Sequence, residues 1–180
     1  QIPGTTWSTL GDAAYGTYSV SAIKTDGTLW VWGRNYFGML GQNQSPGNLG
    51  AYSSPIQIPG TNWRKVAMGD ECSAATKTDG TLWTWGRDKD GSGGRGPSDN
   101  TTYSSPVQVP GTTWNDFGLF AQVLANKTDG TLWAWGGAGS GQLGQNERTN
   151  YDSPVQIPGT DWNAKVWIGI DNMYATKKTY

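Results

Sequence analysis

Lys24-Thr-Asp-Gly-Thr-Leu-Trp-Val-Trp-Gly33 is a ten-residue segment that the chain repeats twice more, almost without change. The second copy runs from Lys77 to Gly86 with Thr84 in place of valine, and the third runs from Lys127 to Gly136 with Ala134 there. The copies begin 53 and 50 residues apart. A regular period of this length indicates a tandem array of supersecondary units and suits a propeller blade or a solenoid repeat.

A second block repeats out of phase with the first. It reads Gln-Ile-Pro-Gly, or Gln-Val-Pro-Gly in one copy, and a tryptophan follows after two further residues. The four copies are Gln1–Gly4, Gln57–Gly60, Gln108–Gly111 and Gln156–Gly159, followed by Trp7, Trp63, Trp114 and Trp162. The pattern therefore covers the chain from end to end.

Each unit is expected to contain four strands, and the second unit shows them best. Trp63 to Gly69, Ser73 to Thr78 and Thr81 to Gly86 have the composition of three successive strands. Pro106 to Pro110 is expected to form a fourth, outer strand, because its prolines suit a sheet edge. Asp79-Gly80 is expected to be a two-residue hairpin turn, since an Asp-Gly pair accepts the positive φ angles of primed turns.

Both faces of the expected hairpin carry packing residues. Thr81, Trp83 and Trp85 share one face, and Leu82 and Thr84 share the other, because side chains alternate along a strand. A strand that packs on both sides lies between two sheets, as in a propeller blade. No segment has convincing helical periodicity, so we expect an all-β fold.

Composition limits the partners that the chain can have. Hydrophobic residues make up only 35%, but the 11 tryptophans can supply a core, since each can bury roughly 150–250 Å². The net charge is −1, and no run of basic residues is longer than Lys177–Lys178. We therefore expect no nucleic-acid partner. No apolar stretch approaches the ~20 residues of a membrane span, so no membrane partner is expected either.

Residues suited to catalysis are scarce. The chain has no histidine, which removes the usual general base and the commonest transition-metal ligand. The recurring carboxylates Asp26, Asp79 and Asp129 fall in turns, where Asp-Gly has a structural explanation. Cys72 follows two acidic residues, whose charges oppose thiolate formation. We therefore expect no enzyme activity, no cofactor and no metal.

The combined pattern TDGTLWxWG, GQLG and SPVQIPGTxW resembles the regulator of chromosome condensation repeat. The middle element is Gly38-Met-Leu-Gly41 in the first unit and Gly141-Gln-Leu-Gly144 in the third, whereas the second unit departs with Gly91-Ser-Gly-Gly94. The resemblance covers essentially the whole chain and implies a β-propeller of four-stranded blades, usually seven. The near-identical copies look most like bacterial or phage members, and the chain is expected to be part of a longer array.

The repeats divide the chain into units. We expect three complete blades at residues 5–60, 61–111 and 112–159, the end of a preceding outer strand at 1–4, and the first two strands of an incomplete blade at 160–180. Open ends of an array expose sheet edges and apolar faces. Two hypotheses follow: the chain is a truncated piece with frayed ends, or two chains close one ring, with residues 1–4 of one completing the partial blade of the other.

One segment has features of a calcium loop. In residues 88–93, Asp-Lys-Asp-Gly-Ser-Gly, oxygen-bearing residues alternate as calcium ligands do, and Asp99 occupies the twelfth position. However, Asp99 replaces the usual glutamate, and Arg95 lies inside the loop. The favoured interpretation is a substituted form of the glycine-rich loop of the other units.

Function follows less directly than fold from this resemblance. Family members include a nucleotide exchange factor for a small GTPase, chromatin-binding proteins, a photoreceptor and a bacterial protein inhibitor of β-lactamases. Their common property is a rigid propeller face that binds another protein. The resemblance therefore implies a non-catalytic scaffold with a protein partner. A glycan-binding propeller, with the paired tryptophans stacking on sugars, and a purely structural module of a phage or cell-surface protein are the alternatives.

The predicted binding surface consists of loops. The loops between the first and second strands, and between the third and fourth, are expected on one face, and they vary between units while the strands do not. Variable aromatic and charged loops on a constant scaffold are typical of a recognition surface, although neutral drift leaves similar variation. The candidate binding residues are Tyr18, Arg34, Asn35, Tyr36, Phe37, Asp70, Glu71, Arg87, Asp88, Phe120, Asp171 and Asn172.

Overall fold

The chain is all-β, as the sequence predicts. The computed structural model describes residues 2, 4–14, 17–44, 50–97, 100–162, 165–169 and 172–177. In these segments it contains fifteen strands and two short 3₁₀ turns, η1 (Tyr36–Gly38) and η2 (Lys89–Gly91). No helix among the described residues is long and apolar enough to cross a membrane.

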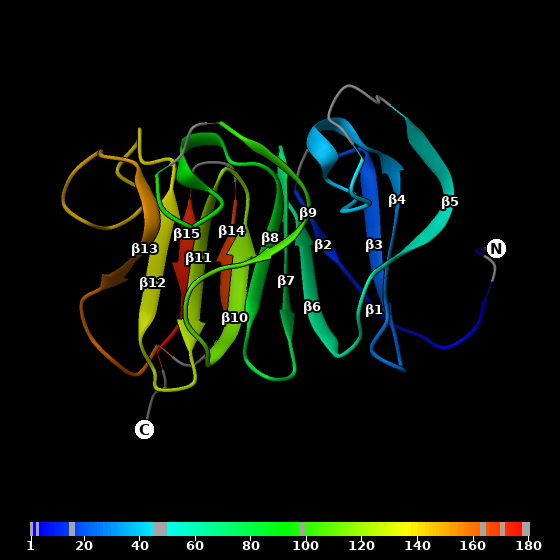
Figure 1. The fold of residues 1–180 in the computed structure, drawn as a ribbon. Coiled ribbons are helices and arrows are strands. Elements are labelled where there is room, and N and C mark those ends of the chain that lie inside the picture. Colours follow the sequence, from blue (N-terminus) through cyan, green and yellow to red (C-terminus); the bar gives the residue numbers. More distant parts are fainter. Residues whose placement is uncertain are drawn as a thin grey trace.

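The strands form a row of antiparallel sheets (Figure 1). The first sheet contains, in spatial order, β1 (Trp7–Leu10), β3 (Ser19–Lys24), β4 (Leu29–Arg34) and β5 (Ala51–Ile58). The second contains β6 (Trp63–Met68), β7 (Cys72–Lys77), β8 (Leu82–Arg87) and β9 (Thr102–Gln108), with β2 (Asp12–Ala13) added in parallel beside β6. The third contains β10 (Trp114–Leu119), β11 (Gln122–Lys127), β12 (Leu132–Gly136) and β13 (Tyr151–Ile157). A two-stranded sheet of β14 (Val166–Ile168) and β15 (Met173–Ala175) follows.

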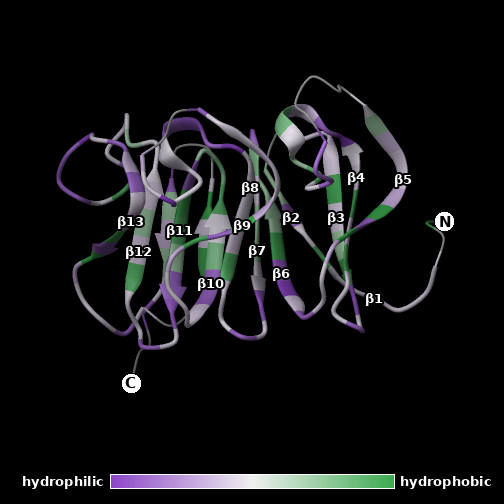
Figure 2. Cartoon of the chain, viewed as in Figure 1, coloured by the Kyte–Doolittle hydropathy of each residue, from purple (hydrophilic) through white to green (hydrophobic). Residues whose placement is uncertain are grey.

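The hydrophobic core lies between the sheets, in one cluster at each boundary. Leu29 and Val31 of β4 pack in one cluster with Trp85 of the second sheet. Leu82 of that sheet packs with Trp135 of the third. Apolar side chains therefore lie within the row. Figure 2 shows hydrophobic residues along the strands and hydrophilic ones in many of the loops and turns at the strand ends. This confirms that the repeated hairpin packs on both faces.

A hydrogen-bonded relay explains the repeated Asp-Gly-Thr-Leu-Trp sequence. In the second sheet the indole Nε1 of Trp83 donates to Thr81 Oγ1 at 2.8 Å, and this hydroxyl donates to Asp79 Oδ1 at 2.7 Å. The backbone N–H of Thr81 also donates to Asp79 Oδ1, at 3.0 Å. The same relay occurs in the first and third sheets. The recurring carboxylates therefore shape turns, and each is held by its own threonine.

The hairpin turn is longer than the two-residue primed turn predicted from Asp79-Gly80. Lys77 N–H donates to the Thr81 carbonyl at 3.0 Å, and Gly80 N–H donates to the Lys77 carbonyl at 3.1 Å. The loop therefore has three residues. Only Gly80 has a positive φ, of 80°, whereas a type I′ turn requires one at Asp79 as well. The two-residue prediction is wrong because Asp79 uses its side chain to cap the turn and stays in the ordinary region.

These turns also join neighbouring sheets. The carbonyl of Gly80 accepts a 2.9 Å hydrogen bond from the backbone N–H of Trp114, the first residue of the third sheet. Gly27 and Trp63 form the same bond at 3.0 Å, across the preceding boundary. One motif thus closes its own hairpin and fixes the start of the next unit.

The outer strand begins earlier than predicted. β9 runs from Thr102 to Gln108, so Pro106 lies within the strand rather than at its start. β9 pairs with β8 alone, which leaves its other edge free of ladder partners in the described chain. Proline is tolerated there because an edge strand needs fewer backbone donors.

The two ends of the row expose apolar side chains. Leu10 is 74% exposed and Val20 is 43% exposed in the first sheet. At the other end, the cross-strand partners Trp167 and Tyr174 are 50% and 59% exposed. The hypothesis that two chains close one ring stays a prediction.

Candidate functional site: the loop face

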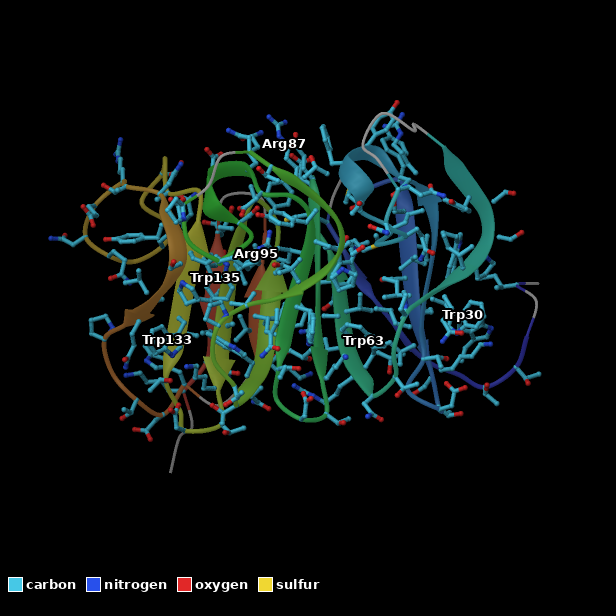
Figure 3. All side chains as sticks on the ribbon, viewed as in Figure 1. Trp30, Trp63, Arg87, Arg95, Trp133 and Trp135 are labelled. Atoms are coloured by element: carbon cyan, nitrogen blue, oxygen red, sulfur yellow. The ribbon has the colours of Figure 1, made fainter. Side chains whose placement is uncertain are left out.

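The predicted loops emerge at one end of the sheets. Arg34 N–H donates to the Tyr18 carbonyl at 3.0 Å, and Arg87 N–H donates to the Glu71 carbonyl at 2.9 Å. Each bond joins the last residue of the third strand to the loop before the second strand of the same sheet. In Figure 3, Arg87 lies at this end, while Trp30, Trp63 and Trp133 lie toward the opposite end. We call this end, formed by residues 17–19, 34–39, 70–71 and 87–91, the loop face.

An arginine stacked on aromatic rings dominates the first unit of the loop face. The guanidinium carbon of Arg34 lies 4.6 Å from the ring centroid of Tyr18 and 4.0 Å from that of Tyr36. The Tyr36 and Phe37 rings meet edge to face, with centroids 6.4 Å apart. Such contacts hold a cation through the ring quadrupole and fix the orientation of the guanidinium plane.

The second unit uses an ion pair at the equivalent position. Arg87 Nη1 lies 3.0 Å from Glu71 Oε2, and Lys89 Nζ lies 3.8 Å from Glu71 Oε1. The Arg87 guanidinium also lies 5.2 Å from the ring centroid of Phe37. Since Phe37 belongs to the first unit, this contact connects the two units into one surface.

A hollow of about 240 Å³ lies between these two units. Six of the predicted binding residues line it: Tyr18, Arg34, Tyr36, Phe37, Asp70 and Glu71. Thr17, Ser19 and Met39 complete the wall. The structure therefore brings together half of the predicted set. The first and last of the loops that supply these residues are about 50 residues apart in the sequence.

Asn35 and Asp88 were predicted to lie on the binding surface, but both are buried, at 2% and 4% exposure. Asn35 Oδ1 accepts the backbone N–H of Leu40 at 3.0 Å, and Asp88 Oδ1 accepts that of Gly93 at 2.7 Å. An ion pair of 3.5 Å with Arg95 also engages Asp88. These side chains shape the loops from inside and do not offer polar atoms to a partner.

Two other predicted residues lie away from the hollow. Phe120 is half-buried in the third unit, where its carbonyl accepts the thiol of Cys72 at 3.5 Å. Asn172 is exposed beside the last two-stranded sheet, and its carbonyl accepts the Gly169 N–H at 2.8 Å. Asp171 lies outside the described residues.

The segment with calcium-loop features folds as η2 and its flanks. Asp90 adopts a φ of 54° and accepts a 3.2 Å hydrogen bond from Asn150 Nδ2, while Asp88 faces Arg95. In the described part of the chain, no cluster of three or more His, Cys, Asp or Glu side chains could hold a metal ion. Asp99 lies outside the described residues. The segment has the same 3₁₀ turn as the loop of the first unit, with Asp90 at the position of Phe37, whose φ is 56°.

Cys72 is a core residue. Its side chain is 4% exposed, and burial raises the pKa of its thiol to about 12, with smaller contributions from the charges of Asp88, Asp70 and Glu71. A thiol with this pKa is almost entirely protonated at neutral pH and is a poor nucleophile.

The tryptophans pack as triads, and in the second and third units the two members of the Trp-x-Trp pair differ in burial. Trp85 and Trp135 are 1% and 0% exposed, whereas Trp83 is half-buried. Lys77 Nζ lies 4.7 Å from the Trp83 ring centroid and 4.6 Å from that of Trp63. Trp83 lines a hollow of about 440 Å³ together with Pro59 and Pro106. Trp85 and Trp135 are too deeply buried to offer a ring face to a sugar, whereas the half-buried Trp83 borders this hollow.

Sequence reasoning missed a charged ladder on the innermost strands. Lys65 Nζ lies 2.6 Å from Asp116 Oδ1 and 3.5 Å from Asp12 Oδ2. Asp116 Oδ2 also accepts the backbone N–H of Val166 at 3.1 Å. The ladder lines a hollow of about 500 Å³. Lys65 and Asp116 occupy the same position of successive units, two residues after Trp63 and Trp114, but the residue type changes between the units, so a search for repeated residues did not reveal the ladder.

Repeated four-stranded antiparallel sheets, packed face to face and joined by short turns, define a partial β-propeller. The model of the regulator of chromosome condensation (RCC1) repeat matches residues 26–76 and 129–168, just over half of the chain. The chain therefore belongs to the RCC1 repeat family.

Known proteins support this assignment. The chain is 35% identical over 88 residues to the human E3 ubiquitin-protein ligase HERC2, a match that covers 46% of this chain and 2% of HERC2. Among solved structures, Prp20p from Saccharomyces cerevisiae, which binds Gsp1p and histones, superposes with a TM-score of 0.78 at 18% identity, covering 97% of this chain and 44% of Prp20p. Human WBSCR16 superposes with a TM-score of 0.77 at 23% identity, covering 96% of this chain and 45% of WBSCR16. The chain thus spans less than half the length of these relatives. The bacterial or phage origin stays a prediction.

Proposed function

We propose that the chain is a non-catalytic, protein-binding module of an RCC1-type propeller and that its partner contacts the loop face. The observation that carries this proposal is the cluster of Tyr18, Arg34, Tyr36 and Phe37 around a hollow between the first and second units. Tyrosine and arginine are the side chains most often found at the energetic centres of protein interfaces.

The rigidity of the scaffold favours binding. Backbone hydrogen bonds tie the loops before the second strands to the ends of β4 and β8, and the Arg34 guanidinium lies against the rings of Tyr18 and Tyr36. Groups that are ordered before binding lose little entropy on complex formation. The binding of Prp20p to Gsp1p and histones is consistent with this role, since that protein has the same fold.

Site-specific photo-crosslinking tests the proposal. A photoreactive amino acid replaces Asp70, which is exposed on the loop face, and the matched control carries it at Thr78, which is exposed at a hairpin turn on the opposite end. Both proteins are irradiated in extract of the source cells, and adducts are identified by mass spectrometry. We expect a discrete protein adduct from position 70 that position 78 does not give.

Two results would contradict the proposal. Equal adduct yields from positions 70 and 78 indicate that cell proteins contact both ends of the sheets without preference. Adducts from position 78 alone indicate that the partner binds at the hairpin turns. Circular dichroism of both variants confirms that the fold is kept.

A further inference from the structure

Arg34 and Arg87 occupy equivalent positions in the first and second sheets, but their charges are balanced differently. The backbone N–H of each donates to the residue that precedes the second strand of its sheet, which is Tyr18 for Arg34 and Glu71 for Arg87. The same backbone geometry thus places a carboxylate beside Arg87 and an aromatic ring beside Arg34.

The charge of Arg34 lacks a counter-ion in the described part of the chain. Its guanidinium carbon lies 4.6 Å and 4.0 Å from the ring centroids of Tyr18 and Tyr36, which are aromatic partners and not carboxylates. The ion pairs among the described residues involve Lys65, Arg87, Lys89 and Arg95 but not Arg34. The two rings hold the guanidinium in place, so an incoming anion meets a donor that is already oriented.

The acidic residues of the hollow do not balance this charge. The carboxylate of Glu71 is engaged by Arg87 at 3.0 Å and by Lys89 at 3.8 Å. Asp70 is exposed, so water and salt screen its charge. Arg34 is half-buried and is therefore the less screened of the two unpaired groups.

We propose that Arg34 is the anchor for an aspartate or glutamate side chain in an acidic segment of a partner protein. This inference rests on the proposed function and specifies the chemistry of the partner. A guanidinium presents two parallel N–H groups that match the two oxygens of a carboxylate. The hollow of about 240 Å³ beside Arg34 has room for such a side chain.

A pair of peptide probes tests the anchor directly. One fluorescein-labelled peptide contains several glutamates spaced by glycine and serine, and its twin has glutamine at the same positions. Fluorescence anisotropy at low salt is expected to show about tenfold tighter binding of the acidic peptide. Arg34→Gln removes this preference, and Arg34→Lys keeps only part of it because an ammonium group lacks the two-pronged geometry. Asp70→Asn strengthens binding by about twofold, because a nearby like charge is removed.

Arg148→Gln is the matched control, since it removes the same charge from an exposed arginine of the third unit that does not line the hollow. It is expected to leave the preference unchanged. Equal losses in Arg34→Gln and Arg148→Gln indicate an effect of net charge and overturn the proposal. A wild-type chain that binds both peptides equally overturns it as well.

Crosslinking separates this inference from the function on which it rests. Arg34→Gln is introduced into the chain that carries the photoreactive residue at position 70. Loss of the adduct supports the anchor. An unchanged adduct yield overturns the anchor but leaves the protein-binding function standing, whereas a wild-type loop face that gives no adduct contradicts the function itself.

Discussion

Trp85 reaches across the boundary between the first two sheets and donates a 2.7 Å hydrogen bond from its indole Nε1 to the backbone carbonyl of Met39. Met39 follows the 3₁₀ turn of the first unit, within the glycine-rich element of the repeat. Trp135 makes the same bond, at 3.2 Å, to the carbonyl of Ser92 in the second unit. In the second and third units the second tryptophan therefore ties its own sheet to the loop of the sheet before it, and this explains why the two sequence elements recur together.

Trp85→Phe tests this connection. The substitution removes the hydrogen bond and part of a ring that is 1% exposed, and we expect it to lower the free energy of unfolding by about 2–3 kcal/mol. Trp32→Phe is the matched control, because Trp32 is the equivalent residue of the first sheet and is only half-buried. A loss below about 1 kcal/mol is expected there. Urea unfolding followed by circular dichroism measures both, and equal losses would show that the bond across the boundary contributes nothing specific.

The repeated glycine that ends the Trp-x-Trp-Gly motif gives a second prediction. Gly86 has a φ of 95°, and a Cβ there would lie 2.6 Å from the Glu71 carbonyl oxygen. Gly86→Ala combines backbone strain with a clash against backbone and is expected to destabilise the chain by about 3 kcal/mol or more. Gly139→Ala is the control, since no atom lies within 4 Å of a Cβ at that exposed position. Thermal unfolding distinguishes the two, and a Gly86→Ala chain as stable as Gly139→Ala contradicts the geometry.

The repeats predicted the fold well because packing and turn chemistry recur with the motif. Trp85 and Leu82 lie on opposite faces of one strand, and period-two alternation is sufficient to predict that both are buried. The Asp79-Gly80 turn was located correctly but assigned the wrong type. The turn type depends on the φ of Asp79, which is positive in a type I′ turn and stays in the ordinary region when the side chain caps the turn. Composition alone does not distinguish these two conformations.

The loop face was predictable in position but not in detail. Strand alternation and hairpin connectivity place Arg34 and Tyr18 at the same end of the sheets, and in the structure the Arg34 guanidinium carbon lies 4.6 Å from the Tyr18 ring centroid. The burial of Asn35 and Asp88 was missed, since a polar residue after a strand is equally compatible with exposure or with capping a loop from within. The signal was present, however, in the glycines three to five residues further on, whose tight turns need buried acceptors.

Cys72 gives a prediction on chemical reactivity. Burial raises the pKa of its thiol to about 12, and the carbonyl of Phe120 accepts the thiol at 3.5 Å. We expect the folded chain at pH 8 to react with a thiol-specific disulfide reagent at least about a hundredfold more slowly than the chain in urea, because both the thiolate fraction and access are reduced. The absorbance of the thiol that the reagent releases measures the reaction rates of the folded and the unfolded chain. Fast labelling of the native chain would place Cys72 outside the core.

The three aspartates of the hairpin turns predict how stability depends on pH. Hydrogen bonds from the hydroxyl and the backbone N–H of Thr81 hold the pKa of Asp79 below its ordinary value of 3.8, and the equivalent threonines do the same for Asp26 and Asp129. A carboxylate with a lowered folded pKa stabilises the native state above its unfolded pKa, and this contribution is lost as the pH falls through the folded pKa. Stability is therefore expected to decline below about pH 4, as each proton weakens the relay to the tryptophan.

A chain with Asp26→Ser, Asp79→Ser and Asp129→Ser keeps short turn-forming side chains that do not titrate. Its Tm should be lower than that of the native sequence at pH 7, and the difference should shrink by about half or more at pH 2. Calorimetry across this range measures both curves, and a constant difference between them would show that these carboxylates stabilise the turns without regard to their charge.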